Sequence, residues 1–160
     1  KTTHAHQLAA SLVFYSPLQT IFWYDKPSFY HGEPEMEWFE NLQTVFDDTK
    51  VLDGAPGKNI TMARRKGQEW FVAAMTNNEG SEEEIPLTFL DKEKNYLACI
   101  YTDGGEKIKT STQVKCTYLL VNASQTMKFQ LKPSGGAAIR LVPIDRQEMK
   151  KYKKYKGERL

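Results

Sequence analysis

The stretch ITMARRKGQEWFVAAMTN, residues 60–77, decides the fold of this chain. Two β-rich runs, 60–65 and 69–75, flank the pair Lys66-Gly67. Glycine reaches positive φ without steric cost, so the stretch predicts a β-hairpin whose turn lies at this pair.

The second arm of the hairpin has no polar face. If it is a strand, one face carries Trp70, Val72 and Ala74, and the other carries Phe71, Ala73 and Met75. An antiparallel strand with one side in water should alternate apolar and polar residues. Other parts of the protein must therefore cover both faces of this strand.

Composition limits the class of protein. A chain of 160 residues can hold one domain with a proper core, or one domain and a piece of another. An apolar fraction of 40% with 12% aromatic residues excludes global disorder. No apolar run approaches the roughly 20 residues that span a bilayer, and the first residues lack a signal-peptide pattern. We therefore expect a soluble chain without an address signal of its own.

The cysteines and the charge exclude some functions. Cys99 and Cys116 both fall in predicted strands, where a buried free thiol is the commonest state and a disulfide between adjacent strands is the alternative. Residues 150–160 hold six basic residues and one acidic residue, a charge of +5, so the total of +2 leaves −3 for the rest. A mildly acidic body argues against nucleic-acid binding across the fold.

The first third of the chain predicts short helices. Thr2 or Thr3 can cap a helix that runs to about Tyr15, with apolar residues three to four apart. Prolines then mark three further starts: a second short helix after Ser16, a turn over 28–31, and a helix rich in aromatic residues. Those starts are Pro17, Pro27 and Pro34.

A strand and a break follow the helices. Residues 44–52, TVFDDTKVL, predict a strand with an acidic interruption. Asp53-Gly54 and Pro56-Gly57 then give two turn signals within five residues, and the sequence predicts a domain boundary there.

The rest of the chain alternates short apolar runs with turn-forming segments. Beyond the hairpin, strands are predicted over 84–89, 96–102, 113–121, 126–131 and 137–142. Seven strands at this spacing favour an antiparallel β-sandwich.

Several ordered motifs resemble one enzyme family. They are HAHQLAASLVFYSPLQ, TVFDDTKVLDG, MARRKGQEWFVAAMTNN, PLTFL and LKPSGGAAIRLVP. Together, over about residues 2–143, they look like the C-terminal portion of glycoside hydrolase family 97. That family has an N-terminal β-sandwich, a central (β/α)8 barrel and a C-terminal β-sheet domain. The resemblance implies a mainly β protein: the end of a catalytic (β/α)8 barrel over 1–53, a C-terminal antiparallel β-sandwich over 58–143, and a basic tail over 144–160.

The resemblance also implies a function. The family cleaves α-glycosidic bonds with a glutamate acid and a partner carboxylate, and glutamates hold calcium near the sugar. Those residues lie upstream of this chain, so it should be inactive alone and contain no metal or cofactor site. Its role would be to brace the barrel or to join subunits of an enzyme that acts on α-glucosides or α-galactosides in the periplasm or outside the cell. Its partners would be the upstream catalytic barrel or another subunit, with carbohydrate as substrate and no nucleic acid or membrane.

One departure from the family pattern concerns the acidic residues. Residues 46–49 are Phe-Asp-Asp-Thr where the family usually has Trp-Asp-Glu-Thr. Asp47 and Asp48 are adjacent in a predicted strand, so they point to opposite faces and cannot act as an acid/base pair. Asp47 is the candidate for a position near the substrate, because barrel enzymes place working residues at the C-terminal ends of strands. The alternative is that both aspartates end the strand and cap local backbone.

Three residues of the hairpin are candidates for an interdomain contact. Arg64 and Arg65 alternate across the strand, so one must point to a buried or interfacial side, where arginine usually pairs with a carboxylate. Asp47 and Asp53 are the candidate partners. Phe71 would pack against the barrel remnant or another subunit.

Other candidate sites have simpler explanations. Trp23, Tyr24, Trp38 and Phe39 could stack on sugar rings, as in a stand-alone carbohydrate-binding module, but core or interdomain packing is the commoner role. His4 and His6 do not share a helix face, which disfavours a metal site, and His31 has no evident partner. The tail KKYKKYKGERL could bind nucleic acid or an anionic surface, although a solvated tail is the expected state.

Overall fold

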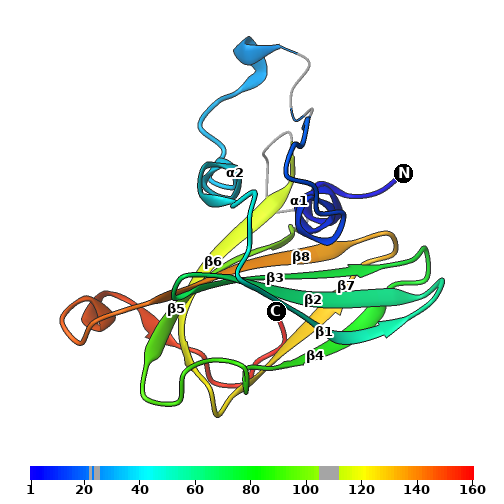
Figure 1. Cartoon of the computed structure of the whole chain (residues 1–160). Coiled ribbons are helices and arrows are strands. Elements are labelled where there is room, and N and C mark those ends of the chain that lie inside the picture. The colour runs from blue at the N-terminus through cyan, green and yellow to red at the C-terminus, as the bar shows by residue number, and fades with distance from the viewer. Residues whose placement is uncertain (22, 24–25, 105–111) are drawn as a thin grey trace.

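A computed structural model describes residues 1–21, 23, 26–104 and 112–160. The described part holds a curved sheet with helices on one face and a two-stranded ribbon on the other (Figure 1). The helices are α1 (His4–Val13), α2 (Met36–Asn41) and the short 3-10 turns η1 (Pro27–Phe29) and η2 (Glu148–Lys151). The strands are β1 (Asp48–Ala55), β2 (Asn59–Lys66), β3 (Glu69–Thr76), β4 (Ser81–Pro86), β5 (Asn95–Asp103), β6 (Val114–Asn122), β7 (Thr126–Leu131), β8 (Gly136–Pro143) and β9 (Lys153–Lys154).

The larger sheet has seven described strands in the order β1-β2-β3-β8-β5-β6-β9. Its neighbours are antiparallel, except that β9 runs parallel to β6. Strands β4 and β7 pair with each other in a second, antiparallel sheet. The prediction of a mainly β, antiparallel fold behind a short helical segment is confirmed.

Strand β3 has both faces buried, as its sequence predicted. Trp70, Val72 and Ala74 lie in a core between the large sheet and the β4–β7 ribbon. Phe71, Ala73 and Met75 lie in a second core between the same sheet and the helices. The sheet is therefore the middle layer of three, and β3 lies inside it between β2 and β8.

The hairpin of β2 and β3 closes where the sequence places it. Lys66 pairs with Glu69, and Gly67 has a φ of +58°, which favours glycine. Glu69 also receives two hydrogen bonds from Arg140 on β8, at 2.9 and 3.1 Å. The hairpin is thus joined to the next strand of the sheet by a bidentate ion pair.

The break predicted at Asp53-Gly54 is not a break in the structure. Strand β1 continues through both residues to Ala55, and it pairs with β2 from Asp48↔Arg65 to Ala55↔Asn59. The change of direction comes later, at Gly57 with a φ of +77°. Gly54 fits an extended edge strand, where a shift of register between Val51 and Asp53 marks a bulge. Strand β1 is therefore paired into the large antiparallel sheet. The division of the chain at residue 53 into a barrel end and a C-terminal domain stays a prediction.

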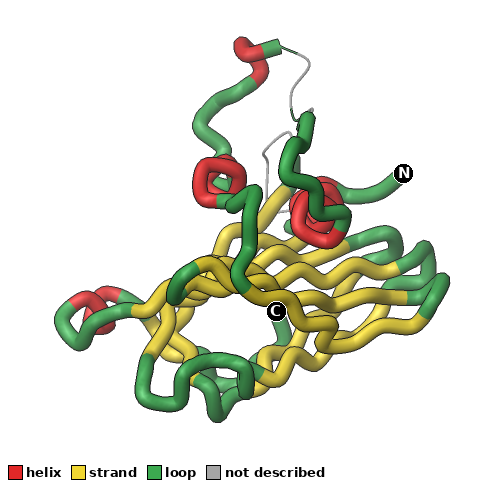
Figure 2. The backbone as a smooth tube through the Cα atoms, viewed as in Figure 1, coloured by secondary structure: helices red, strands yellow, loops and turns green. Residues whose placement is uncertain are grey.

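The helical segment is less regular than predicted (Figure 2). Helix α1 is capped by Thr3, whose hydroxyl accepts from the His6 N–H at 3.1 Å, as expected. The short helix predicted after Ser16-Pro17 does not form in the described residues. Leu18, which lies in the predicted helix, is 85% exposed. Without a surface to pack on, so short a helix has little to stabilise it.

The basic tail is folded, which contradicts the predicted solvated tail. Tyr155 is buried, and its hydroxyl accepts from the Lys128 N–H and donates to the Glu158 carbonyl oxygen. Leu160 exchanges backbone hydrogen bonds with β7, and Arg159 forms an ion pair with Glu82. The lysines point outward while the tyrosine anchors the segment in the core, a pattern that composition alone could not separate from a disordered tail.

Candidate interaction surface

The helical segment packs on the large sheet through a continuous apolar contact. Leu8, Ala9 and Leu12 of α1 are fully buried in the same core as Phe71 and Ala138 of the sheet. Gly136 of β8 has no room for a side chain, because an added Cβ would lie 2.8 Å from the His6 Cα. The close approach of α1 to β8 thus depends on a glycine.

Aromatic rings fill the centre of this contact. The rings of Trp38 and Phe71 meet edge to face at 5.7 Å, and Tyr101 and Phe46 add similar contacts at 6.0 Å. Both Trp38 and Phe71 are fully buried. Phe71 therefore packs between the helical segment and the sheet, and its role as an interdomain contact stays a prediction.

Arg64 fastens the end of α1 to the sheet. Its Nε donates to the Leu12 carbonyl oxygen at 3.0 Å, and a terminal nitrogen donates to the Thr49 hydroxyl at 2.9 Å. The guanidinium lies over the Tyr15 ring, 4.9 Å from its centre. Burial lowers the pKa of Arg64 from its ordinary value. The predicted carboxylate partner is replaced by helix carbonyls, which are free acceptors at a helix C-terminus.

Arg65 and Asp47 lie on the other side of the strand, at the hairpin turn. The Asp47 carboxylate accepts from the Gly67 N–H at 2.7 Å and lies 3.9 Å from Arg65. The Gly67 hydrogen bond holds the pKa of Asp47 below its ordinary value, and Lys66 adds to the shift. Arg65 donates to the Gly67 carbonyl oxygen. Both side chains stabilise the turn, which is the backbone-capping alternative for Asp47; a place near substrate stays a prediction.

A cluster of tyrosine, thiol and carboxylate groups lies under α2 and was missed from the sequence. Glu37 accepts hydrogen bonds from the hydroxyls of Tyr101 at 3.2 Å and Tyr118 at 2.8 Å. Burial, with Glu37 nearby, raises the pKa of both tyrosines. Cys99 and Cys116 are free thiols, as expected, and burial raises the pKa of each to about 12. Pairing between strands brings the tyrosines and thiols together. The sequence does not show which strands pair.

A buried carboxylate on the other face was also missed. Glu83 of β4 is 4% exposed and accepts hydrogen bonds from the side chains of Asn59, Thr61 and Ser81. The bonds from Asn59 and Thr61 link the small ribbon to β2 of the large sheet. Alternation along a strand places Glu83, the middle one of three consecutive glutamates, on the opposite face from its neighbours. Alternation does not show which of the two faces is buried.

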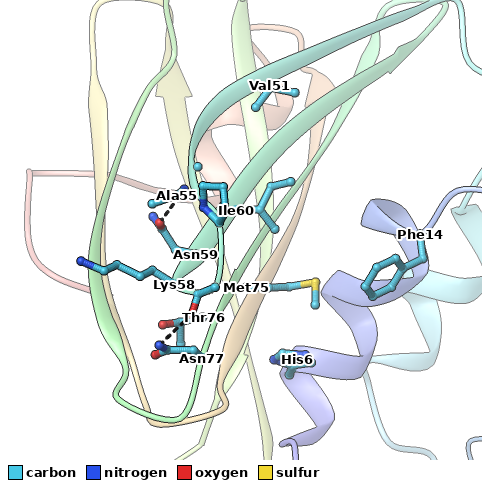
Figure 3. A pocket seen from close by; sticks show the side chains of 13 residues that line it. His6, Phe14, Val51, Ala55, Lys58, Asn59, Ile60, Met75, Thr76 and Asn77 are labelled. Carbon is cyan, nitrogen blue, oxygen red and sulfur yellow. Dashed lines mark hydrogen bonds between the residues drawn. The ribbon is translucent and has the colours of Figure 1, made fainter.

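An apolar hollow of about 620 Å³ lies between α1 and the ends of β1, β2 and β3 (Figure 3). Phe14 and His6 line it from the helix, and Val51, Ile60 and Met75 line it from the sheet. No carboxylate belongs to its lining among the described residues. A lining of this kind suits apolar contact and holds no pair of carboxyl groups.

Exposed apolar side chains extend this surface along the helical segment. Phe14 is 71% exposed and lies between the hollow and a second depression that also includes Leu18, Ile21 and Trp23. Val45 and Val51 are 56% and 65% exposed. Large exposed apolar residues of this kind are typical of interaction surfaces.

The three histidines considered from the sequence each contact a neighbouring residue. The ring of His4 packs against Trp23, and His6 Nδ1 lies 3.0 Å from the Gly135 carbonyl oxygen. The His31 N–H donates to Glu33. Among the described residues no group of three or more histidine, cysteine, aspartate or glutamate side chains could hold a metal.

The aromatic residues considered for sugar stacking do not form an open platform. Trp38 is fully buried, and Trp23 packs edge to face on Phe39 at 5.0 Å. Tyr24 lies outside the described residues. In the described part of the chain, no helix is long and apolar enough to cross a membrane.

Comparison with known proteins identifies the family. Residues 45–142 match the family described as glycosyl-hydrolase 97 C-terminal, oligomerisation. The chain belongs to glycoside hydrolase family 97. The matched range begins just before β1 and ends in β8, so it includes most of the large sheet and the whole β4–β7 ribbon.

Relatives extend the family 97 similarity into the helical segment. The chain is 35% identical over 140 residues to a retaining α-galactosidase of Bacteroides thetaiotaomicron, which covers 87% of this chain and 21% of that protein. A family 97 enzyme of Pseudoalteromonas sp. strain K8, solved with acarbose, has 33% identity and a TM-score of 0.79, covering 90% of this chain and 23% of the other. A solved β-arabinopyranosidase has 25% identity and a TM-score of 0.68, covering 88% and 21%. The chain thus spans about a fifth of the length of these relatives.

Proposed function

We propose that this chain is the non-catalytic C-terminal part of a family 97 α-glycosidase, in which it braces the catalytic barrel and joins subunits. The observation that carries this proposal is the exposed apolar surface of the helical segment, from Phe14 to Leu18 and Ile21. In the proposed protein the upstream barrel covers this surface. Residues of the helical segment are then the last part of the barrel, held to the sheet by Phe71 and Arg64.

Two buried polar groups without hydrogen-bond partners support the proposal that another polypeptide contacts the helical segment. The carboxylate of Glu35 and the Nε1–H of Trp23 are buried and have no hydrogen-bond partner among the described residues. Folded proteins pair the large majority of such groups. Both belong to the segment that the barrel would contact, and a third such group is the hydroxyl of Thr76, a β3 residue that lines the hollow beside α1.

The catalytic groups of the proposed enzyme lie outside this chain. Glycoside hydrolysis needs two carboxyl groups on opposite sides of the anomeric carbon, about 5 to 9.5 Å apart. The carboxylates described above are engaged in the turn at Gly67, in the tyrosine cluster or in the Glu83 network. The calcium, the choice between α-glucosides and α-galactosides, and a periplasmic or extracellular location belong to the same proposal about the longer protein.

The proposal predicts that the purified chain does not hydrolyse glycosides. Aryl α-galactoside and aryl α-glucoside should be turned over no faster than in buffer, because in this proposal the catalytic carboxyl groups lie outside the chain. Turnover that is lost in Asp47→Asn would overturn the proposal and would place Asp47 at a substrate site. Circular dichroism of both proteins checks that they are folded.

The alternative, a stand-alone carbohydrate-binding module, has less support. Such a module needs an open aromatic face, but Trp38 and Trp70 are 0% and 5% exposed. Titration with maltose, α-glucan or galactosides should therefore leave the tryptophan fluorescence unchanged. Saturable quenching would favour the module instead.

A further inference from the structure

The folded C-terminal segment presents several lysines at the β6 edge of the large sheet (Figure 1). Its exposed lysines are Lys150, Lys151, Lys153, Lys154 and Lys156. Within the described residues only Lys151 of this set forms an ion pair, at 4.0 Å from Glu148. Residues 150–160 hold six basic residues and one acidic residue, against a total charge of +2 for the chain. An anionic partner would therefore be attracted to this end of the molecule more than to the rest.

A buried tyrosine and backbone hydrogen bonds hold this segment in place. The Tyr155 N–H donates to the Leu120 carbonyl oxygen at 3.0 Å, and the Tyr155 carbonyl oxygen accepts from the Gln125 side chain at 2.9 Å. At the start of the segment, the Ile144 N–H donates to the Asn95 carbonyl oxygen at 3.0 Å. Since folding has already ordered the backbone that carries the lysines, a ligand has less chain to order than on a flexible tail.

Two adjoining polar depressions lie beside these lysines. They share Asn95 and Asn122, which are opposite each other in β5 and β6. The larger, of about 370 Å³, includes Lys92, and the smaller, of about 100 Å³, includes Lys154. The rest of the larger lining is Glu93, Lys94, Ala123 and Ser124. The two depressions together are called the lysine site below.

The lysine site offers hydrogen-bond donors and positive charge to a ligand rich in oxygen atoms. Lys92 and Lys154 form no ion pair, and the Asn95 side chain forms no hydrogen bond, within the described part of the chain. The Asn122 side-chain oxygen accepts from the loop that follows it, so its amide N–H groups stay available. Glu93 is the one carboxylate of the described lining, and the two unpaired lysines outnumber it. Ammonium groups bind carboxylates or sulfates, and amides hydrogen-bond sugar hydroxyls.

Other anionic partners fit these surroundings less well. No large apolar side chain that is exposed among the described residues belongs to the lysine site or to residues 145–160, so none is offered for insertion into a bilayer. Nucleic-acid strands stack their bases on open aromatic rings, but Tyr155 is buried and Tyr152 is half-buried. A chain of sugars needs neither feature, because hydroxyls and acidic substituents meet amides and ammonium groups.

We propose that the lysine site binds an acidic polysaccharide, one whose sugar units carry carboxylate or sulfate groups. The polymer lies along the C-terminal segment, and an acidic substituent enters the larger depression beside Lys92. Residues 144–160 lie outside the range that matches the family, so this function is additional to bracing the catalytic barrel. It also differs from recognition of neutral sugars by tryptophan, since no tryptophan lines the described site.

Titration calorimetry with polygalacturonate tests the proposal on the full chain. Binding should weaken as salt rises, because salt screens the lysines, and neutral dextran should not bind. Lys92→Glu and Lys154→Glu should each weaken binding by about tenfold, because each replaces an attraction by a repulsion. Glu93→Gln removes the carboxylate from the lining and should strengthen binding by about threefold.

The controls separate the lysine site from general charge attraction. Lys58→Glu makes the same charge change in the turn between β1 and β2, at the opposite edge of the large sheet, and should leave the affinity unchanged. Asn95→Ala should weaken binding of polygalacturonate but not of polyglutamate, which has carboxylates and no sugar hydroxyls. Thermal melting by circular dichroism must match wild type for each variant.

Three results would overturn the proposal. They are absence of binding to polygalacturonate, an equal loss of affinity in Lys58→Glu and Lys92→Glu, and an equal or higher affinity for polyglutamate, a DNA duplex or phosphatidylglycerol vesicles. Weaker binding of all three comparison ligands supports it. None of these results changes the predicted lack of glycosidase activity, so failure of this inference is distinct from failure of the proposed function.

Discussion

Phe71 and its two neighbours in β3 belong to different hydrophobic cores. Phe71 points to the helical side of β3, whereas its neighbours Trp70 and Val72 point to the ribbon side. It is fully buried and meets Trp38 and Phe46 edge to face. Burial of a phenylalanine and favourable ring geometry both stabilise this contact.

Replacing Phe71 should therefore destabilise the fold strongly. Phe71→Ala leaves a cavity among aromatic rings and should lower the free energy of unfolding by about 3–5 kcal/mol. Phe71→Asp also buries an unpaired charge and should cost more. Urea unfolding followed by circular dichroism measures both. Leu18→Ala, at an exposed site, should change stability by at most about 0.5 kcal/mol, and an equal effect of the two alanine variants would refute this role.

Asp47 should make stability depend on pH. Its pKa in the folded state is below the ordinary value of 3.8, chiefly because of the Gly67 hydrogen bond. A group whose pKa is lowered by folding stabilises the folded state above its unfolded pKa, and this contribution is lost as pH falls through the folded pKa. Asp47→Asn should thus be less stable than wild type at neutral pH, and the two should converge below about pH 4.

The measurement is a series of urea midpoints from pH 7 to pH 2.5. Asp48→Asn is the matched control, since that carboxylate bonds the adjacent Thr49 N–H and not the hairpin turn. A constant difference between wild type and Asp47→Asn across this range would contradict the assignment.

At the scale of elements, the C-terminal segment seals one end of the ribbon-side core. Tyr155 lies in that core, and its backbone N–H donates to the Leu120 carbonyl oxygen on β6. The Gln130 N–H donates to the Leu160 carbonyl oxygen. The segment thus spans from β6 to β7 and ties the two sheets together.

Two substitutions of Tyr155 should separate packing from hydrogen bonding. Tyr155→Ala removes a buried ring and should cost about 3–5 kcal/mol of stability. Tyr155→Phe keeps the ring but leaves the Lys128 N–H without its acceptor, so the cost should be about 1–3 kcal/mol. Tyr152→Ala, at a less buried tyrosine of the same segment, should have the smaller effect. Chemical unfolding of the three variants gives the order, and equal costs would show that the segment is not anchored at Tyr155.

The success of prediction from sequence differs between elements for physical reasons. The hairpin and the double burial of β3 follow from local alternation and one glycine, which the sequence displays directly. The strand predicted over 84–89 begins three residues too late, since β4 begins at Ser81. The core-facing Glu83 breaks the apolar pattern, because it is stabilised by partners distant in sequence. The docking of the C-terminal segment and the tyrosine cluster depend on tertiary register, which local patterns do not encode.

At the scale of the whole molecule, the large sheet lies between two hydrophobic cores and contributes side chains to both. The helix-side core includes Cys99, with Cys116 packed against it, and the ribbon-side core contains neither thiol. The thiols therefore report on the contact between the helical segment and the sheet. That contact is the one that the proposed bracing role requires to be stable.

Thiol labelling should show whether the helical segment and the sheet unfold together. A pKa of about 12 for each cysteine lowers the thiolate fraction at pH 8 by about three orders of magnitude relative to a free cysteine. Labelling with a thiol reagent should be slow in buffer and should rise with urea along the same transition as the circular dichroism of the sheet. Labelling that precedes the loss of β signal would mean that the helical segment detaches first, and the contact could not brace a catalytic domain. Phe71→Ala should shift both curves to lower urea together, because that ring belongs to the same core as the thiols.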